Sequence, residues 1–187
     1  MKYVGIEKKS EGNFITRYDV TYRTVDDKEK VYEMISRNKE ISTLEELNGT
    51  EADAVVIIVT DETGEKCLLN REFRMAAGDY VYNFPAGLID EGENYEQAAI
   101  RELKEETGLE LYEITEVLGT SYSAVGFSNE TNITVIGKAR GEFSESTSTV
   151  EEIDARWYTK EEVRELLKKH KFAARTQAYC YMWSREQ

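Results

Sequence analysis

The chain has 187 residues and a formal net charge of −13, with 40% hydrophobic and 11% aromatic residues. This length favours one main domain, or one domain with a small appendage, and the apolar content excludes a disordered chain. The negative charge disfavours binding to nucleic acid or to anionic membranes, because both are polyanions.

The sequence predicts a cytoplasmic protein. It contains no stretch near the roughly 18 apolar residues of a membrane helix, and residues 1–9 lack the apolar core of a signal peptide. The only cysteines, Cys67 and Cys180, have no metal-type spacing and do not indicate a disulfide.

Residues 1–50 predict a small N-terminal antiparallel β-sheet. Residues 14–22 alternate between two sets of side chains, as in a strand, and residues 31–37 return as its partner after a polar turn. We expect the main domain to follow as residues 51–187.

The main domain begins with strand patterns. Residues 54–59 form an apolar run typical of a strand buried on both faces. A turn that includes Gly64 leads to a second hairpin strand at residues 67–73, and a further strand is predicted at 80–84, before Pro85.

A helix rich in acids is predicted for residues 95–107. Gly92 and Asn94 are suited to the turn or cap before it, and Gly108 is a natural stop. At about 100° per residue, we expect the apolar side chains to dock the helix and the charged ones to point away. The first group is Ala99, Ile100, Leu103 and Thr107, and the second is Arg101, Glu102, Glu105 and Glu106.

The acids of this helix are placed unfavourably for an ordinary surface. Glu102 and Glu106 are four residues apart, with Glu105 beside both, so like charges repel by a few tenths of a kcal/mol per pair. A divalent cation removes this penalty, and clustered carboxylates suit Mg²⁺ or Mn²⁺. Arg101 precedes Glu105 by four residues and is placed to hold it.

Further strands and a connection follow the acidic helix. Strands are predicted at residues 116–123 and 131–140 around a loop at 124–130, and a last strand at 153–158. Residues 141–150 are rich in Ser, Thr and Glu and predict a mobile connection.

Two helices complete the chain. Thr159 and Glu162 form a capping-box pattern before a helix at residues 160–170, and residues 172–185 predict a second helical stretch. We interpret the lone His170 as exposed and non-catalytic. Mixed strands with two or three helices predict a sheet between helices.

Residues 87–109 carry a family resemblance. Every specified position matches the Nudix hydrolase signature G-x5-E-x7-R-E-U-x-E-E-x-G-U, where U is a bulky aliphatic residue. The matching residues are Gly87, Glu93, Arg101, Glu102, Leu103, Glu105, Glu106, Gly108 and Leu109. The resemblance implies an α/β (α+β) fold, the Nudix α/β/α sandwich with a mixed sheet, over residues 51–187.

The segments around this signature resemble ADP-ribose pyrophosphatases and related nucleoside-diphosphate-sugar hydrolases. An arginine-bearing strand at residues 70–74 precedes a Pro-Ala-Gly turn, and members of that subgroup commonly form dimers through an N-terminal antiparallel domain. Two positions depart from the subgroup: Asn83 replaces a Glu, and Val125 before Gly126 replaces a marker proline. These departures weaken the expectation that ADP-ribose itself is the substrate more than the expectation of pyrophosphatase chemistry.

The resemblance implies that the helix acids bind Mg²⁺, with Mn²⁺ as a substitute. Glu102 and Glu106 are the first ligand candidates, Glu105 is the next, and the Ala86 carbonyl adds an oxygen. Glu93 is expected to hold the loop and the helix together. Catalysis then rests on cations and on an aligned water, because phosphoryl transfer needs little covalent help.

A general base is expected outside the signature. The similar enzymes use a Glu from a late loop, where this chain has Glu151 and Glu152, and Glu130 is another candidate. Each is also compatible with ordinary acidic surface. The candidate catalytic residues are therefore Glu102, Glu105, Glu106 and Arg101 with Glu151 or Glu152.

Arg74 is the first candidate for substrate contact, because a guanidinium grips phosphate oxygens bidentately. Arg71 is the alternative; the two face opposite sides of a regular strand, so only one should enter the site. Gly126 and Glu130 are candidates in the loop that follows the signature. Aromatic residues that either stack on a base or pack the small sheet are Phe14, Tyr18, Tyr22 and Tyr32.

Together these features predict a Mg²⁺-dependent pyrophosphatase that acts as a homodimer on a small nucleotide. The expected substrate is a nucleoside diphosphate linked to a sugar, such as ADP-ribose, and the products are a nucleoside monophosphate and a sugar phosphate. Two alternatives stay open: hydrolysis of nucleoside triphosphates or capped nucleotides, and a non-catalytic Nudix domain that binds a nucleotide. The complete set of signature carboxylates disfavours the last.

Overall fold

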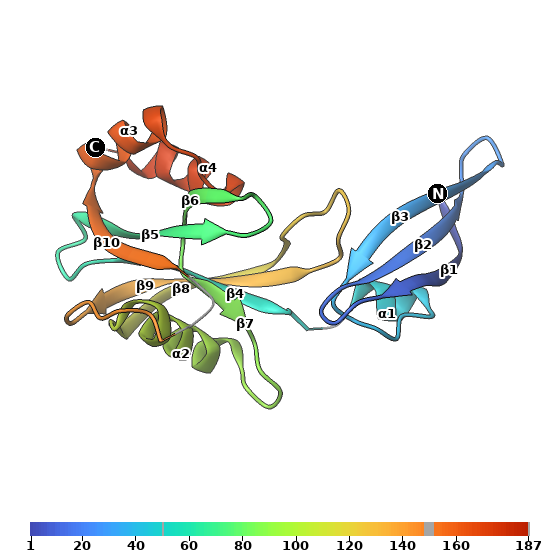
Figure 1. Cartoon of the computed structure of the whole chain (residues 1–187), viewed down its shortest axis with the longest axis horizontal. Helices are drawn as coiled ribbons and strands as arrows, with labels where there is room; N and C mark the ends of the chain where they lie inside the picture. The colour runs from blue at the N-terminus through green and yellow to red at the C-terminus, as the bar shows by residue number, and fades with distance from the viewer. Residues whose placement is uncertain (50, 148–151, 187) are drawn as a thin grey trace. The chain divides into compact units, whose positions relative to one another are not determined.

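The computed structural model describes residues 1–49, 51–147 and 152–186, which form two compact units (Figure 1). The N-terminal unit comprises Met1–Ala54 and Thr120–Asn132. The sandwich unit comprises Val55–Gly119 and Ile133–Gln187. Residues 120–132 thus join the N-terminal unit, although they lie within the stretch that follows residue 51.

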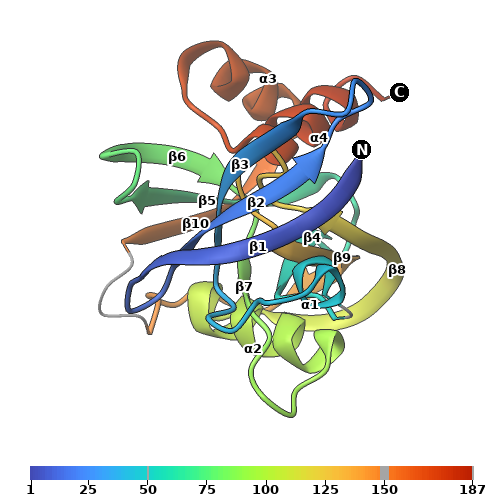
Figure 2. The same ribbon diagram turned by 90° about the vertical axis from the view of Figure 1, so that its right-hand side faces the viewer.

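The N-terminal unit contains a three-stranded antiparallel sheet of β1 (Lys2–Glu11), β2 (Thr16–Arg23) and β3 (Glu29–Ser36), with a short helix α1 (Leu44–Asn48) (Figure 2). The strands β2 and β3 confirm the predicted hairpin, whereas the sequence patterns did not indicate β1. Alternate residues of β2 face the core, where Tyr18 and Val20 pack with Met34, Ile41 and Leu47.

The sandwich unit is built on a seven-stranded mixed sheet. Five strands follow the order β10-β5-β4-β9-β8, while β6 pairs with β5 and β7 pairs with β4. The strands are β4 (Ala54–Thr60), β5 (Lys66–Arg74), β6 (Asp79–Asn83), β7 (Ala86–Leu88), β8 (Glu110–Tyr122), β9 (Thr131–Arg140) and β10 (Ile153–Thr159).

Helices cover both faces of this sheet (Figure 1). On one face, Ala99 and Leu103 of α2 (Tyr95–Thr107) pack with Val55, Ile57 and Val59 of β4. On the other, α3 (Lys160–Lys169) and α4 (Ala174–Trp183) pack through their buried residues against the alternate β4 residues. These two cores confirm the predicted α/β/α sandwich and the burial of β4 on both faces.

Several elements differ from the sequence-based expectation. The short strand β7 was not expected, and β8 begins at Glu110, six positions before the predicted start at 116. The predicted connection at 141–150 is described only as far as Thr147, whose backbone N–H donates to the Glu105 carbonyl. Residues 148–150 lie outside the described residues.

Two further expectations can be compared with the structure. Cys67 and Cys180 are buried free thiols. Within the described part of the chain, none of the helices has the length and apolar character needed to cross a bilayer.

Candidate active site

The acid-bearing helix α2 has the bounds that the sequence predicts, Tyr95–Thr107. Asn94 caps it: the Asn94 side chain accepts a hydrogen bond from the Gln97 N–H at 2.9 Å, and the Gln97 side chain accepts one from the Asn94 N–H at 3.0 Å. Gly108 ends it in the left-handed conformation, at φ 80°. Both termini are therefore encoded locally.

The orientation of α2 differs from the predicted one at two residues. Glu106, expected to point away from the docking face, is only 6% exposed, and Ile100, expected to dock, is 49% exposed. The physical reason is the helical repeat: Glu106 follows Ala99 by seven residues, about two turns, so both lie on the buried face. One acid of the helix is thus carried into the core.

Glu102 lies directly against the backbone of Gly87. A Cβ atom on residue 87 would stand 1.9 Å from Cδ of Glu102 and 2.0 Å from its Oε1, so any side chain there would have to push this carboxylate aside. The absence of a side chain at Gly87 therefore gives the Glu102 carboxylate its position. This contact connects strand β7 to the middle of α2.

Arg101 connects the loop before α2 to the acids on it. Its Nε and Nη2 atoms donate to the two carboxylate oxygens of Glu93 at 2.9 and 2.8 Å, and Nη2 also donates to the Leu88 carbonyl at 3.0 Å. Its Nη1 lies 2.7 Å from Glu102 and 3.5 Å from Glu105. The hydrogen bond from Arg101 lowers the pKa of Glu93, and the same contact raises the pKa of Arg101.

Glu106 is held from the opposite side, by strand β5. The Asn70 side chain donates from Nδ2 to Glu106 Oε2 at 2.6 Å, and Asn70 is fully buried. Glu105, in contrast, has a side chain that is 49% exposed. The three signature acids of α2 therefore have distinct surroundings: a glycine backbone for Glu102, solvent for Glu105 and a buried amide for Glu106.

The two faces of β5 separate the candidate arginines. Asn70, Glu72 and Arg74 occupy every second position of β5 and therefore lie on one face of the strand. Because Asn70 bonds to Glu106, this face is the one that faces α2. Arg74 Nη1 lies 3.6 Å from Glu72 Oε1, and its side chain is 56% exposed. Asn83 donates to Glu72 at 2.9 Å and accepts from Thr176 of α4 at 2.9 Å, so this acid is also fixed by a buried polar network.

The other face of β5 carries Arg71 and one candidate base. The Arg71 guanidinium lies 3.8 Å from the ring centroid of Tyr80. The Tyr80 hydroxyl donates to Glu152 Oε1 at 2.5 Å, and this bond raises the pKa of Tyr80. Glu152 thus contacts the face of Arg71 and not the face of Asn70 and Arg74. Glu151 lies outside the described residues.

Gly126 and Glu130 belong to the N-terminal unit. The Tyr32 hydroxyl donates to the Gly126 carbonyl, and Arg37 Nε donates to a Glu130 carboxylate oxygen at 2.5 Å. The structure joins this loop to strand β3, which sequence spacing does not reveal.

The four aromatic candidates of the N-terminal unit have different surroundings. Tyr18 is fully buried in the core, and Tyr22 packs against that core. Phe14 and Tyr32 are 78% and 43% exposed. Tyr18 therefore has the packing role, while Tyr32 presents part of its ring to solvent.

In the sandwich unit, His170 is exposed, as predicted.

Among the described residues, no three acidic, imidazole or thiol side chains lie in a preformed metal geometry. The donor set nevertheless fits a hard divalent cation. Glu102 and Glu106 carry mostly covered carboxylates on successive turns of α2. Beside Glu106, the buried Asn70 Oδ1 atom has no hydrogen-bond partner in the described part of the chain. Such an acceptor suits a hydrated ion, since Mg²⁺ keeps several of its waters.

Sequence reasoning did not single out three residues of this region, Asn70, Glu72 and Tyr80. Asn70 and Glu72 had a detectable pattern, because these polar residues follow the apolar run of residues 67–69 within a predicted strand. Tyr80 had none, since a tyrosine in a strand is ordinarily a packing residue.

Comparison with known proteins agrees with these observations. The family model described as NUDIX domain matches residues 50–180. A solved structure described as an ADP compounds hydrolase superposes with a TM-score of 0.74 at 22% identity, over 99% of this chain and 93% of that one. This likeness concerns the fold.

Three curated relatives have informative names. The ADP-sugar pyrophosphatase of Mus musculus is 38% identical over 102 residues, 53% of this chain and 44% of that protein. The ADP compounds hydrolase NudE of Escherichia coli is 36% identical over 92 residues, 49% of this chain and 48% of that protein. The ADP-ribose pyrophosphatase of Saccharomyces cerevisiae is 29% identical over 133 residues, 70% of this chain and 54% of that protein.

The chain spans about half the length of these relatives. Its family match extends over more than half of its own residues and includes the whole acid-bearing helix with its glycine turn. The chain therefore belongs to the Nudix family.

Proposed function

We propose that this chain hydrolyses a nucleoside diphosphate linked to a sugar, of the ADP-ribose kind, to a nucleoside monophosphate and a sugar phosphate. The names of the relatives support this substrate class. The observation that carries the proposal is the acid pair of α2, with Glu102 placed by Gly87 and Glu106 placed by Asn70. No structural need of the core explains two covered carboxylates on successive turns.

In the proposed reaction, a water oxygen attacks one phosphorus of the diphosphate, and the bridging oxygen leaves on the other phosphate. Nudix hydrolases generally use divalent cations. Glu102 and Glu106, with Glu105 and the Ala86 carbonyl, would hold Mg²⁺, which would supply charge stabilisation. Arg74, on the α2 side of β5, binds the phosphate oxygens. Arg101 keeps Glu93, Glu102 and Glu105 in place.

The water must lose a proton during this reaction, and Glu152 is our candidate acceptor, with Glu151 as its neighbour in sequence. Because Glu152 is bonded to Tyr80 on the Arg71 face, its side chain must turn toward the α2 side of the sheet to serve as a base. Gly126 and Glu130 are further proposed contacts of the substrate.

The proposal is tested with purified protein, Mg²⁺ and a panel of ADP-ribose, other nucleotide sugars, dinucleotides, nucleoside triphosphates and capped nucleotides. We expect monophosphate release to be fastest from the nucleotide sugars. Faster turnover of triphosphates or caps would favour the alternative hydrolase, and binding without turnover would favour a non-catalytic domain. Glu106→Gln should lower kcat by about a hundredfold or more while the protein stays folded.

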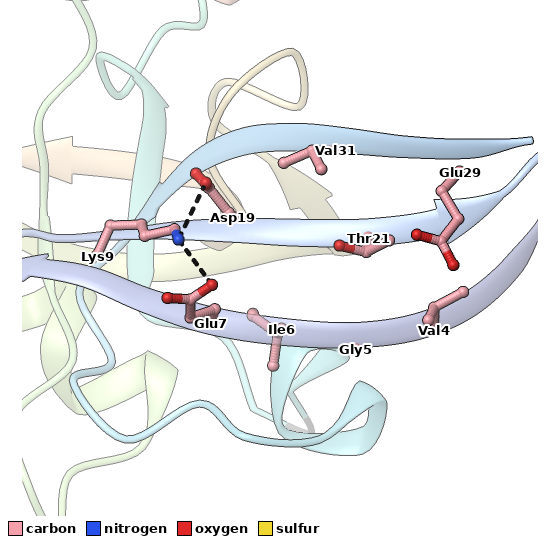
Figure 3. Close-up of a pocket in the computed structure, with 9 residues that line it drawn as sticks. All are labelled: Val4, Gly5, Ile6, Glu7, Lys9, Asp19, Thr21, Glu29 and Val31. Carbon is pink, nitrogen blue, oxygen red and sulfur yellow. Dashed lines mark ion pairs between the residues drawn. The ribbon is translucent and has the colours of Figure 1, made fainter.

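We further propose a homodimer that forms through the N-terminal sheet. This sheet has a hollow of about 360 Å³ with apolar side chains of Val4, Ile6 and Val31, and Lys9 lies beside Glu7 and Asp19 at its edge (Figure 3). Val4 and Val31 are 47% and 50% exposed, which supports an interface. Light scattering after size exclusion should give twice the mass of 21.5 kDa.

The two free thiols support the cytoplasm as the compartment, because reducing conditions keep cysteines unpaired. Fractionation of cells that express a tagged chain tests this assignment. Recovery in the membrane or secreted fraction would contradict it.

A further inference from the structure

Asn70 is a polar residue in a place where the sheet otherwise buries apolar ones. It is fully buried, as are its predecessors Cys67, Leu68 and Leu69 on β5. An amide in the core is unfavourable unless its hydrogen bonds are made, so a valine or leucine is the default residue at such a position. Packing of the core therefore does not explain why an asparagine occupies this position.

One half of the amide acts on Glu106. The Nδ2 atom donates to Oε2 of Glu106 at 2.6 Å, across 36 positions of the chain. The NH₂ end of Asn70 faces this carboxylate, and this orientation suits an ionised acid, which accepts hydrogen bonds but donates none. Because a strand residue holds it, the long side chain of Glu106 is limited in its rotamers.

The other half of the amide is an acceptor without a protein partner. Oδ1 of Asn70 is buried and makes no hydrogen bond to any described residue. A buried acceptor in a native protein is ordinarily satisfied by water or by a bound group. Its place, on the same amide that contacts Glu106, matches the surroundings of a hydrated cation.

We propose that Asn70 is a positioning residue for the cation site: its NH₂ group sets the orientation of the Glu106 carboxylate, and its Oδ1 accepts a hydrogen bond from the hydration shell of the cation. This inference rests on the proposed function, in which Glu106 is a metal ligand. It assigns a role to a side chain outside the signature helix. Partners of metal ligands commonly change metal affinity by about tenfold to a hundredfold when they are removed.

The test measures Mn²⁺ affinity without substrate, by electron paramagnetic resonance of the free ion, in wild type, Asn70→Leu and Asn70→Val. Both variants remove the amide but keep a side chain of similar size next to the buried apolar residues of β5, so at least one should fold. We expect their Mn²⁺ dissociation constants to rise by about tenfold to a hundredfold. We expect the melting temperature of the metal-free protein to fall only slightly, because the variants remove a buried unpaired acceptor together with the donor to Glu106.

The control is Asn132→Leu. Asn132 is also a buried asparagine, 1% exposed, and its side chain bonds to Ser121 and Ser123 in the N-terminal unit. This variant should lose thermal stability and keep the wild-type Mn²⁺ affinity per folded molecule. Circular dichroism measures the folded fraction of each variant.

Unchanged Mn²⁺ affinity in a folded Asn70→Leu or Asn70→Val protein overturns the inference, as does a loss that only follows the folded fraction. The substrate panel gives a separate answer. If the wild type hydrolyses no nucleotide but loses Mn²⁺ affinity in both variants, the proposed substrate is wrong and the role of Asn70 stands. If the wild type is active and the variants bind Mn²⁺ normally, the proposed substrate class stands and the role of Asn70 is wrong.

Discussion

At the scale of single residues, Gly87 has the sharpest constraint in the site. Its backbone lies where the Glu102 carboxylate needs space, with a hypothetical Cβ 1.9 Å from Glu102 Cδ. In Gly87→Ala, the methyl group must push the carboxylate away. We expect kcat to fall by roughly tenfold to a hundredfold, as for a displaced metal-ligand partner, with a smaller change in stability. Steady-state kinetics at several Mg²⁺ concentrations measure this.

A matched control for this substitution is Gly119→Ala. Gly119 lies on β8, and a Cβ there meets nothing within 4 Å. The control should retain wild-type kinetics. Equal losses in both variants would show that general strand or turn effects, and not the Glu102 contact, cause the defect.

The Arg101–Glu93 pair makes stability depend on pH at a single residue. The hydrogen bond from Arg101 lowers the pKa of Glu93 from its ordinary value of 4.5. A carboxyl with a lowered folded pKa stabilises the fold above its unfolded pKa, and this contribution is lost as the pH falls through the folded pKa. Glu93→Gln should therefore lower the melting temperature at neutral pH, and the difference from wild type should vanish in acid.

Melting curves from neutral pH to below 4.5 test this window. Glu91→Gln changes an exposed acid of the same loop and is the control. A wild-type advantage over Glu93→Gln that stays constant down to the lowest pH would mean that shape, and not charge, explains the effect.

At the scale of elements, strand β5 separates the two candidate arginines, and the proposed function assigns the substrate contact to Arg74. Arg74 shares a face with Asn70, the contact of Glu106, whereas Arg71 stacks on Tyr80 on the opposite face. Loss of a charged hydrogen bond costs about 1.5–3 kcal/mol, so Arg74→Ala should lower kcat/KM by roughly tenfold to a hundredfold. Arg71→Ala should leave kcat/KM nearly unchanged and slightly lower the melting temperature.

Arg74→Lys sharpens this comparison. Lysine keeps the charge but not the planar fork of arginine, so partial activity is expected if the contact with phosphate is bidentate. A larger kinetic defect in Arg71→Ala than in Arg74→Ala would reverse our assignment of the two faces of β5.

At the scale of the whole molecule, we expect the net charge and the proposed cation site to affect stability together. The chain carries −13 and concentrates acids on α2, so a cation that binds only the folded state should stabilise it. At a hundredfold excess over its Kd, Mg²⁺ should add about 2.7 kcal/mol to the free energy of unfolding. Calorimetry with Mg²⁺ or with a chelator measures the shift.

Sodium chloride at matched ionic strength separates site binding from general screening of charge. Glu106→Gln should show the screening effect but not the additional shift with Mg²⁺. An equal Mg²⁺ shift in wild type and in this variant would place the stabilising ion elsewhere.

The sequence alone determined the elements whose information is local. The cap at Asn94 and the stop at Gly108 define α2 through neighbouring backbone groups, so its bounds follow from pattern alone. The signature spacing indicated the family, and the apolar run of β4 predicted burial on both faces. The edge strand β1 escaped prediction because its residues are largely exposed, so its burial pattern carries little information.

Only the tertiary structure decided how distant segments meet at the site. The bond from Asn70 to Glu106 spans the distance from β5 to α2, and the contact of Gly87 with Glu102 depends on how closely β7 approaches the helix. The joining of residues 120–132 to the N-terminal unit is likewise a long-range contact. Spacing along the chain defines which way a side chain leaves its own element, whereas packing between elements defines what that side chain meets.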